Sequence, residues 1–239
     1  MKQKISNLKL EKRRYDLKEK VSLVEKFQLW RNKPIQKIIG YIIMADVKID
    51  LSKKVLIPRY ETEELIYQTI DFIEENQYKE ILDLCCGSGF IGIALKKFFN
   101  EINVCQSDID KNAIKQTIIN LKLNNIQNDV IQSNMFENIN KKFDLIVSNP
   151  PYLSEKEISL ISKSVLKFEP HKALFAKNNG LEFYEIIEKN LNKYLKKNGM
   201  IILEINPDNE KWFLNNGYNL IKDINGKKRI AFKKKDWIS

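Results

Sequence analysis

The chain has 239 residues, a length that fits one α/β domain of ordinary size with a small appendage. Hydrophobic residues make up 43% and aromatic residues 10% of it, which excludes a disordered chain. The longest apolar stretches, such as Met200 to Ile205, are too short for a membrane span, and the charged N-terminus has no signal-peptide core. We therefore expect a soluble, cytoplasmic, monomeric protein with no membrane partner.

The formal net charge is +10 at pH 7, from 41 basic and 31 acidic residues. This excess of positive charge is compatible with a weak electrostatic contact with RNA. An AT-rich coding bias toward lysine explains the excess equally well. The cysteines are Cys85, Cys86 and Cys105, and the only histidine is His171. Neither their number nor their spacing suits a disulfide framework or a metal site, so we expect buried thiols and no metal.

The first 33 residues predict one or two helices, because apolar residues recur at helical spacing between Leu8 and Trp30. Residues 34–63 predict a β-hairpin linker with its polar turn at Asp50 to Lys53, followed by a helix from Glu63 to Glu75. The main domain is expected to occupy residues 64–239.

Strands and helices alternate from residue 79 onward. The sequence predicts helices after the first strand, at Lys111–Leu123 and at Leu181–Lys196, and seven strands: Glu80–Leu84, Ile102–Ser107, Asp129–Gln132, Phe143–Ser148, Met200–Ile205, Tyr218–Asp223 and Lys228–Phe232. This order predicts a Rossmann-like α/β fold, with a mostly parallel seven-stranded sheet and helices on both faces. Asn225-Gly226 predicts a terminal hairpin, which would give the sheet an antiparallel edge.

The first strand of the main domain ends in a glycine-containing loop, Cys85-Cys86-Gly87-Ser88-Gly89. Gly87 and Gly89 allow a sharp turn into the next helix, where a ligand can approach the helix N-terminus. The loop also satisfies G-x-G-x-x-G, with Asp108 about 20 residues further on, so the loop alone does not separate NAD from S-adenosylmethionine. An acid inside the strand end, Asp83, favours S-adenosylmethionine.

Asp108 closes the second strand of the main domain. A carboxylate there can accept hydrogen bonds from both hydroxyls of a ribose. The alternative role, capping the next helix, suits Asp110 better, because Lys111 begins that helix.

The fourth strand leads directly into Asn149-Pro150-Pro151-Tyr152. In a doubly wound sheet this is the carboxyl edge, where ligands bind. The Asn149 side-chain oxygen and the Pro150 carbonyl can accept both N–H groups of an amide or amino nitrogen, and the Tyr152 ring can pack against the planar group. Such an arrangement would orient a weakly nucleophilic nitrogen toward a methyl sulfonium.

With these motifs the chain resembles the HemK/PrmC family, the N5-glutamine methyltransferases of class-1 peptide chain release factors. The resemblance runs from Pro34 to about Phe232. It includes Pro34-Ile35-Gln36-Lys37-Ile38-Ile39-Gly40, Val55-Leu56-Ile57-Pro58-Arg59-Tyr60-Glu61-Thr62-Glu63, the glycine loop, Asp108, Asn149-Pro150-Pro151-Tyr152, and Glu169-Pro170 with Ala173-Leu174 and Gly180-Leu181. Adenine methyltransferases share the N-P-P-Y motif but lack the segment around Arg59.

The resemblance implies that S-adenosylmethionine is the cofactor, release factors are the partners and the fold is that of the class I methyltransferases. The residues that it implies for cofactor binding are Asp83, Cys85, Gly87, Ser88, Gly89 and Asp108, with Thr62 and Asn149 at the border of the pocket. The target glutamine would meet Asn149, Pro150, Pro151 and Tyr152, of which Asn149, Pro150 and Tyr152 would be catalytic. Arg59 is equally well explained as a structural ion pair, and His171 as a surface residue.

The sequence also departs from the family pattern. Only 33 residues precede Pro34, where the family usually has a helical domain of some seventy residues, so residues 1–33 would form a reduced substrate-docking domain. The family's G-T-G-[ST]-G loop begins here with Cys85-Cys86, and Tyr60 replaces a proline. Nucleic-acid amino-group methyltransferases and ribosomal-protein glutamine methyltransferases remain alternatives, because both suit the same N-P-P-Y geometry. A non-catalytic scaffold would have no need for both Asp108 and Asn149.

Overall fold

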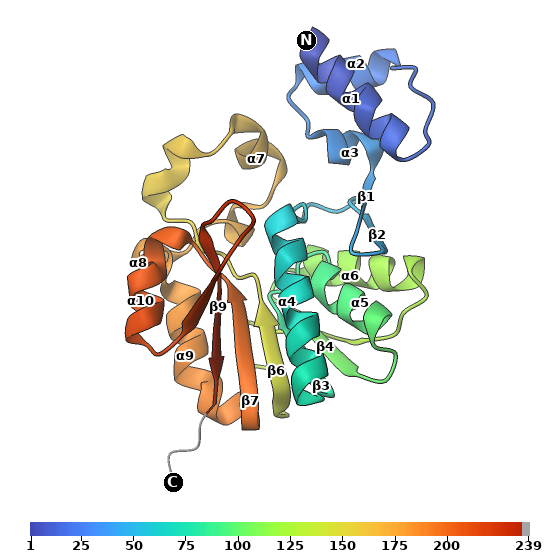
Figure 1. The fold of residues 1–239 in the computed structure, drawn as a ribbon. Coiled ribbons are helices and arrows are strands. Elements are labelled where there is room, and N and C mark those ends of the chain that lie inside the picture. Colours follow the sequence, from blue (N-terminus) through green and yellow to red (C-terminus); the bar gives the residue numbers. More distant parts are fainter. Residues whose placement is uncertain (236–239) are drawn as a thin grey trace.

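The computed structural model describes residues 1–235, so the last four residues of the expected 64–239 domain lie outside the described chain. Its main element is a seven-stranded sheet with the strand order β5-β4-β3-β6-β7-β9-β8 (Figure 1). All neighbouring strands are parallel except β9, which is antiparallel to both β7 and β8. This confirms the predicted mostly parallel sheet with an antiparallel edge. The strands are β3 (Glu80–Leu84), β4 (Asn103–Asp108), β5 (Asp129–Gln132), β6 (Phe143–Ser148), β7 (Leu195–Glu204), β8 (Asn219–Lys222) and β9 (Lys228–Lys234).

Helices cover both faces of this sheet, as predicted (Figure 1). On one face lie α4 (Tyr60–Asn76), α5 (Phe90–Phe98) and α6 (Lys111–Leu123), and on the other lie α9 (Glu182–Tyr194) and α10 (Glu210–Asn215). Each face has its own apolar core, because side chains alternate along a strand: Ile81 packs with the first set of helices and Leu82 with the second. Because side chains from both faces of each strand are buried, both layers of helices pack on the sheet. This packing holds the ends of the strands in place.

Residues 1–33 form helices α1 (Lys2–Arg14) and α2 (Leu23–Trp30), in agreement with the one or two helices predicted there. A third helix, α3 (Ile35–Ile39), lies within residues 34–63, where only a hairpin linker was predicted. The three helices lie apart from the sheet and are connected to the rest of the chain through the hairpin (Figure 1). The hairpin strands are β1 (Tyr41–Met44) and β2 (Val47–Asp50). The predicted hairpin is present, but its predicted turn at Asp50 to Lys53 is wrong. The chain reverses at Ala45 and Asp46, whose φ values are 43° and 56°. Alanine seldom adopts a positive φ, so the sequence does not mark this turn.

A segment with no predicted elements covers the carboxyl end of the sheet. It contains the short helices η1 (Glu155–Leu160), α7 (Lys163–Phe168), η2 (His171–Ala173) and α8 (Lys177–Gly180), and a further short helix, η3 (Pro207–Asn209), follows β7. The segment is anchored where Leu153 pairs with Leu174 and Ala176 through backbone hydrogen bonds of 2.9 Å. Gly180 has φ 88°, and a Cβ there would lie 2.2 Å from the Tyr152 carbonyl oxygen, so the close approach requires glycine. Within residues 1–235, no helix is long and apolar enough to cross a membrane.

Candidate active site

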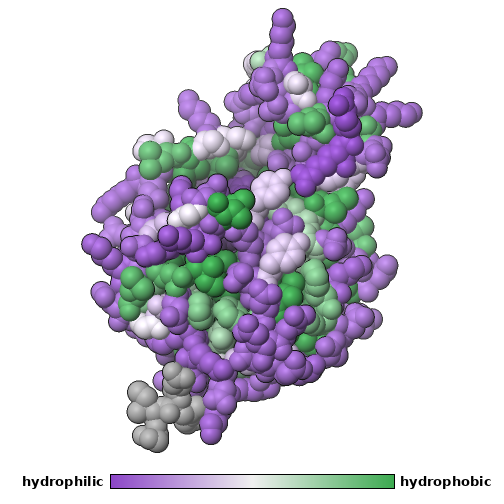
Figure 2. Space-filling view, in the orientation of Figure 1, coloured by the Kyte–Doolittle hydropathy of each residue, from purple (hydrophilic) through white to green (hydrophobic). Residues whose placement is uncertain are grey.

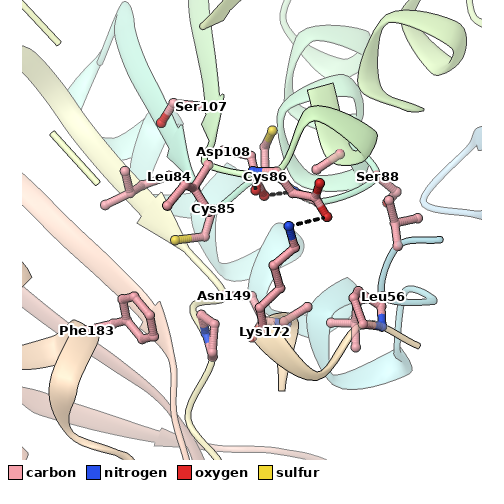
Figure 3. Close-up of a pocket in the computed structure, with 18 of the residues that line it drawn as sticks. Leu56, Leu84, Cys85, Cys86, Ser88, Ser107, Asp108, Asn149, Lys172 and Phe183 are labelled. Atoms are coloured by element: carbon pink, nitrogen blue, oxygen red, sulfur yellow. Dashed lines mark hydrogen bonds and ion pairs between the residues drawn. The ribbon is translucent and has the colours of Figure 1, made fainter. Parts of the chain in front are cut away.

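A cavity of about 400 Å³ opens at the carboxyl ends of β3, β4 and β6 (Figure 3). Of the residues that the sequence predicts for the site, seven line its wall: Thr62, Cys85, Gly87, Ser88, Asp108, Asn149 and Pro151. The wall does not include Asp83, Gly89, Pro150 or Tyr152. Most of the lining is apolar, and its volume lies within the range of small-molecule sites. Parallel strands bring these residues together because their carboxyl ends share one edge of the sheet.

Asp108 lies beside the glycine loop at the end of β4. Its Oδ2 accepts a hydrogen bond from the Gly87 N–H at 2.9 Å, and its Oδ1 accepts one from the Asp110 N–H at 2.8 Å. Burial raises the pKa of Asp108 above its ordinary value, and the two N–H donors oppose that shift. Each carboxylate oxygen has two lone pairs, so both oxygens can still accept a hydroxyl from a ligand. Asp110 caps α6 by accepting a hydrogen bond from the Asn112 N–H, as predicted.

Asp83 lies behind the loop, fully buried, and does not contact the cavity. Its Oδ2 accepts hydrogen bonds from the Gly92 N–H at 3.0 Å and from Gln106 Nε2 at 2.8 Å. Burial raises the pKa of Asp83 to about 7, because it disfavours the charged carboxylate, and nearby Asp108 adds to the shift. Asp83 therefore stabilises the turn from β3 into α5 through hydrogen bonds on the side of the loop that faces away from the cavity.

Cys85 has a left-handed backbone conformation with φ 61°, where the resembled family has glycine. Its side chain is half-buried and its Sγ lies 3.9 Å from the Met135 sulfur. Burial is the main cause that raises the pKa of the Cys85 thiol above its ordinary value, so the thiol stays protonated. A non-glycine residue in this conformation strains the backbone by roughly 1–2 kcal/mol.

This strain predicts an unusual stability order. Cys85→Ala keeps the Cβ and its strain, whereas Cys85→Gly removes both, so we expect the glycine variant to be about 1 kcal/mol more stable than the alanine variant after the entropy of glycine in the unfolded chain is counted. The free energy of unfolding in urea measures the difference. An alanine variant that is as stable as the glycine variant would show that the loop relaxes the strain elsewhere.

Asn149 belongs to a hydrogen-bonded group beside the cavity. Its Nδ2 donates to Thr62 Oγ1 at 3.1 Å, and Thr62 Oγ1 donates to Glu204 Oε2 at 2.7 Å. The Tyr152 hydroxyl donates to the other oxygen of Glu204, Oε1, at 3.1 Å. Burial raises the pKa of Glu204, while the two hydroxyl donors and Arg229 lower it. Burial and the neighbouring Glu204 also raise the pKa of Tyr152, so its hydroxyl keeps its proton.

Two ion pairs hold the cover of the cavity in place. Arg59 Nη2 lies 2.7 and 2.9 Å from the two carboxylate oxygens of Glu169, which is fully buried. Lys172, from η2, pairs with Asp110 at 3.0 Å (Figure 3). Both pairs join the segment after Tyr152 to the start of a helix, since Arg59 directly precedes α4 and Asp110 directly precedes α6. Arg59 is therefore a structural ion pair, one of its two predicted roles, and the exposed His171 contacts only the Leu166 carbonyl among polar groups of the described chain.

Sequence reasoning missed Glu204 and Glu169 as residues of the site. Glu204 is a charged residue at the end of the apolar strand β7, and a buried charge of this kind signals a specific partner. Glu169 belongs to the Glu169-Pro170 motif of the resemblance, but the motif does not indicate its partner Arg59, which lies 110 residues away. No cluster of three or more metal-ligating side chains was found in residues 1–235.

Solved methyltransferase structures match the fold at low sequence identity. One of them is a 16S rRNA N2 G1207 methyltransferase of T. thermophilus in complex with AdoMet and guanosine, with a TM-score of 0.62 and 15% identity, covering 82% of this chain and 50% of that one. This similarity confirms the class I methyltransferase fold. The model of the methyltransferase small domain matches residues 64–174.

Closer relatives are found among curated sequences. The release factor glutamine methyltransferase of Lactococcus lactis is 40% identical over 178 residues, which are 74% of this chain and 66% of that protein. The protein of the same name from Thermodesulfovibrio yellowstonii is 37% identical over 216 residues, which are 86% of this chain and 77% of that protein. The chain thus spans slightly less than two thirds of the first relative and about three quarters of the second. By these similarities, the chain belongs to the release factor glutamine methyltransferase family.

Proposed function

We propose that the protein transfers a methyl group from S-adenosylmethionine to the side-chain amide nitrogen, N5, of the glutamine in the Gly-Gly-Gln loop of class-1 peptide chain release factors. The observation that carries this proposal is the position of Asn149, whose carboxamide borders the cavity at the carboxyl edge of the sheet. The names of the relatives support the choice of substrate.

The residues of the cavity fit the proposed cofactor. The carboxylate of Asp108 can accept both ribose hydroxyls, and apolar side chains such as Ile91 and Phe183 can contact the adenosyl group. Ser107 Oγ is buried in the cavity wall without a hydrogen-bond partner in residues 1–235, so a bound ligand could satisfy it. When bound, S-adenosylmethionine supplies a methyl group on a positively charged sulfur.

The N-P-P-Y residues would hold the amide nitrogen for attack. The Pro150 carbonyl accepts no hydrogen bond from the described chain, and neither does Asn149 Oδ1, so both are available to accept the two N–H groups of a glutamine amide. The bound cofactor would supply the methyl group by breaking its carbon–sulfur bond, and Asn149 and Pro150 would hold the nitrogen that takes this group and gives up one N–H proton to solvent. Alignment of this kind lowers the barrier by up to roughly 7–11 kcal/mol.

The proposal is tested by incubating the protein with isotopically labelled S-adenosylmethionine and release factor, DNA or RNA, followed by mass spectrometry of the modified residue. We expect the label on the glutamine of the Gly-Gly-Gln loop. If nucleic acid is labelled and release factor is not, the substrate is the amino group of a base. The net charge of +10 would then be the observation that supports this substrate.

The exposed face of α2 is a proposed docking surface for the release factor. Its apolar side chains Leu23, Val24, Phe27 and Trp30 are 54–82% exposed, and hydrophobic patches stand out among the hydrophilic residues of the N-terminal helices (Figure 2). Phe27 and Trp30 stack with their ring centroids 5.8 Å apart. Exposed aromatic pairs of this kind are typical of protein interfaces.

The basic residues of α1 are less suited to this role. Lys12 is buried and pairs with Glu25 at 2.6 Å, and Arg13 pairs with Glu19 at 2.9 Å. Arg14 donates to the Tyr60 hydroxyl, which joins α1 to the start of α4. These contacts hold the N-terminal helices together and join them to α4, whereas the apolar side chains of α2 remain exposed.

Substitution of the aromatic pair tests the docking surface. The double variant Phe27→Ser, Trp30→Ser should raise KM for whole release factor by about tenfold or more, because exposed aromatic anchors contribute over 1 kcal/mol each when they bind a partner. KM for a short Gly-Gly-Gln peptide should not change, since the peptide reaches only the cavity. Ile224→Ser, at an 86% exposed position in the β8–β9 turn, is the matched surface control. If KM rises equally for whole release factor and for the peptide, α2 only supports folding.

A further inference from the structure

The hydrogen-bonded group around Asn149 joins three elements that are distant in sequence. Thr62 lies in the first turn of α4, Glu204 is the last residue of β7, and Asn149 directly follows β6. Strands β6 and β7 are parallel neighbours with Ser148 opposite Leu203, so Asn149 and Glu204 come next on the two strands. Thr62 and Glu204 are 5% and 1% exposed, so water does not compete for their hydrogen bonds.

The chemistry of Glu204 determines the direction of these hydrogen bonds. The hydroxyls of Thr62 and Tyr152 each donate to one of its oxygens, and these donors together with Arg229 favour the charged carboxylate against the effect of burial. A carboxylate can only accept. The Thr62 hydroxyl has a single hydrogen, so after this donation its oxygen can only accept. Only the Nδ2 end of the Asn149 carboxamide can meet that oxygen, as it does at 3.1 Å. The reversed carboxamide would place Oδ1 against the lone pairs of Thr62.

We propose that Glu204 is a positioning residue, which acts through Thr62 to hold the Asn149 carboxamide with Oδ1 free for the nitrogen that is methylated. The inference rests on the proposed function, because it assigns Oδ1 the task of accepting the substrate N–H. It also gives Thr62 a role that differs from a contact with the cofactor. The reversed carboxamide would present Nδ2 to the substrate, and two N–H donors would then face each other.

Four variants test this assignment. Glu204→Gln keeps the shape of the side chain but adds a donor, so the Thr62 oxygen can accept from it and the Thr62 hydroxyl becomes free to donate to Asn149. Thr62→Val keeps the shape and removes the hydroxyl. Thr62→Ser keeps the hydroxyl and is the conservative variant that should restore function. The double variant Glu204→Gln, Thr62→Val shows whether Glu204 acts through Thr62.

We expect Glu204→Gln and Thr62→Val each to lower kcat by about tenfold, because the hydrogen bond that is lost orients Asn149 and does not itself contact the reacting nitrogen. The dissociation constant of S-adenosylmethionine should stay within about twofold of the parent, and Thr62→Ser should recover most of the kcat. The double variant should be no slower than Glu204→Gln alone. Thermal unfolding confirms that each variant is folded at the assay temperature. An unchanged kcat in Glu204→Gln would overturn the assignment. So would a double variant whose kcat is reduced by the product of the two single reductions, since the two residues would then act independently.

A measurement without substrate separates this inference from the proposed function. The side-chain NH₂ signals of Asn149, identified by their loss in Asn149→Ala, report the hydrogen bond to Thr62 directly. Hydrogen exchange of this group should be about tenfold faster in Thr62→Val than in the parent protein or Thr62→Ser. Equal exchange in all three would overturn the positioning role. A protected Asn149 in a protein that methylates no release factor would overturn only the proposed function.

Discussion

Asn149→Ala is expected to lower the turnover of release factor on the order of 10²–10³-fold, the usual effect of losing one oriented hydrogen bond in a transition state. The alanine variant removes the acceptor Oδ1, and the Pro150 carbonyl alone cannot hold both N–H groups of the amide. The dissociation constant of S-adenosylmethionine should remain nearly unchanged, because Asn149 is proposed to face the amide. Single-turnover rates, together with calorimetry of cofactor binding, measure the two effects separately.

Asn149→Asp is the matched variant, because it keeps an accepting oxygen and loses the NH₂ group. Thr62 already donates its hydrogen to Glu204 at 2.7 Å, so a second carboxylate would face the lone pairs of Thr62 close to a buried acid. We therefore expect the aspartate variant to be no more active than the alanine variant. Near-parental turnover of Asn149→Asp would mean that acceptance by the oxygen suffices and that the link to Thr62 has no part in catalysis.

The regular part of the fold could be predicted from the sequence because local patterns specify it. The bounds of β3, β5, β6 and α6 agree with the prediction residue for residue. The segment between Leu153 and Leu181 had no such pattern, because its short helices depend on distant contacts. Its fold relies on the ion pair between Arg59 and the buried Glu169, which are 110 residues apart, and on the close approach of Gly180 to Tyr152.

The candidate site shows the same division. Motifs led to seven of the residues that line the cavity, because a strand end and a glycine loop are visible in a single stretch of sequence. The positions of Asp83 behind the loop and of Glu204 behind Asn149 were not accessible in this way. Glu204 meets Thr62 across 142 residues, and only the pairing of β6 with β7 brings it beside Asn149. Residues that orient the site depend on tertiary packing, and of the residues that line it only those within local motifs could be predicted.

Asp108→Ala is expected to weaken the binding of S-adenosylmethionine or its demethylated product by about 1.5–3 kcal/mol, roughly 10- to 150-fold, because a charged acceptor is lost. Calorimetry gives the dissociation constants, and NAD should not bind to the parent protein or to the variant. Part of the loss could reflect the glycine loop, since Asp108 also accepts the Gly87 N–H at 2.9 Å. The experiment must therefore separate the contact with ribose from the support of the loop.

An analogue of S-adenosylhomocysteine without the two ribose hydroxyls makes this separation. In the parent protein the analogue should bind about 10-fold more weakly than S-adenosylhomocysteine or worse, because it leaves the buried carboxylate without its hydroxyl donors. In Asp108→Ala both ligands should bind with the same affinity, since the acceptor that distinguishes them is gone. The loop contributes equally to both ligands and cancels in the comparison. If the variant still prefers the ligand with the hydroxyls, the ribose is held by another residue and Asp108 serves only the loop.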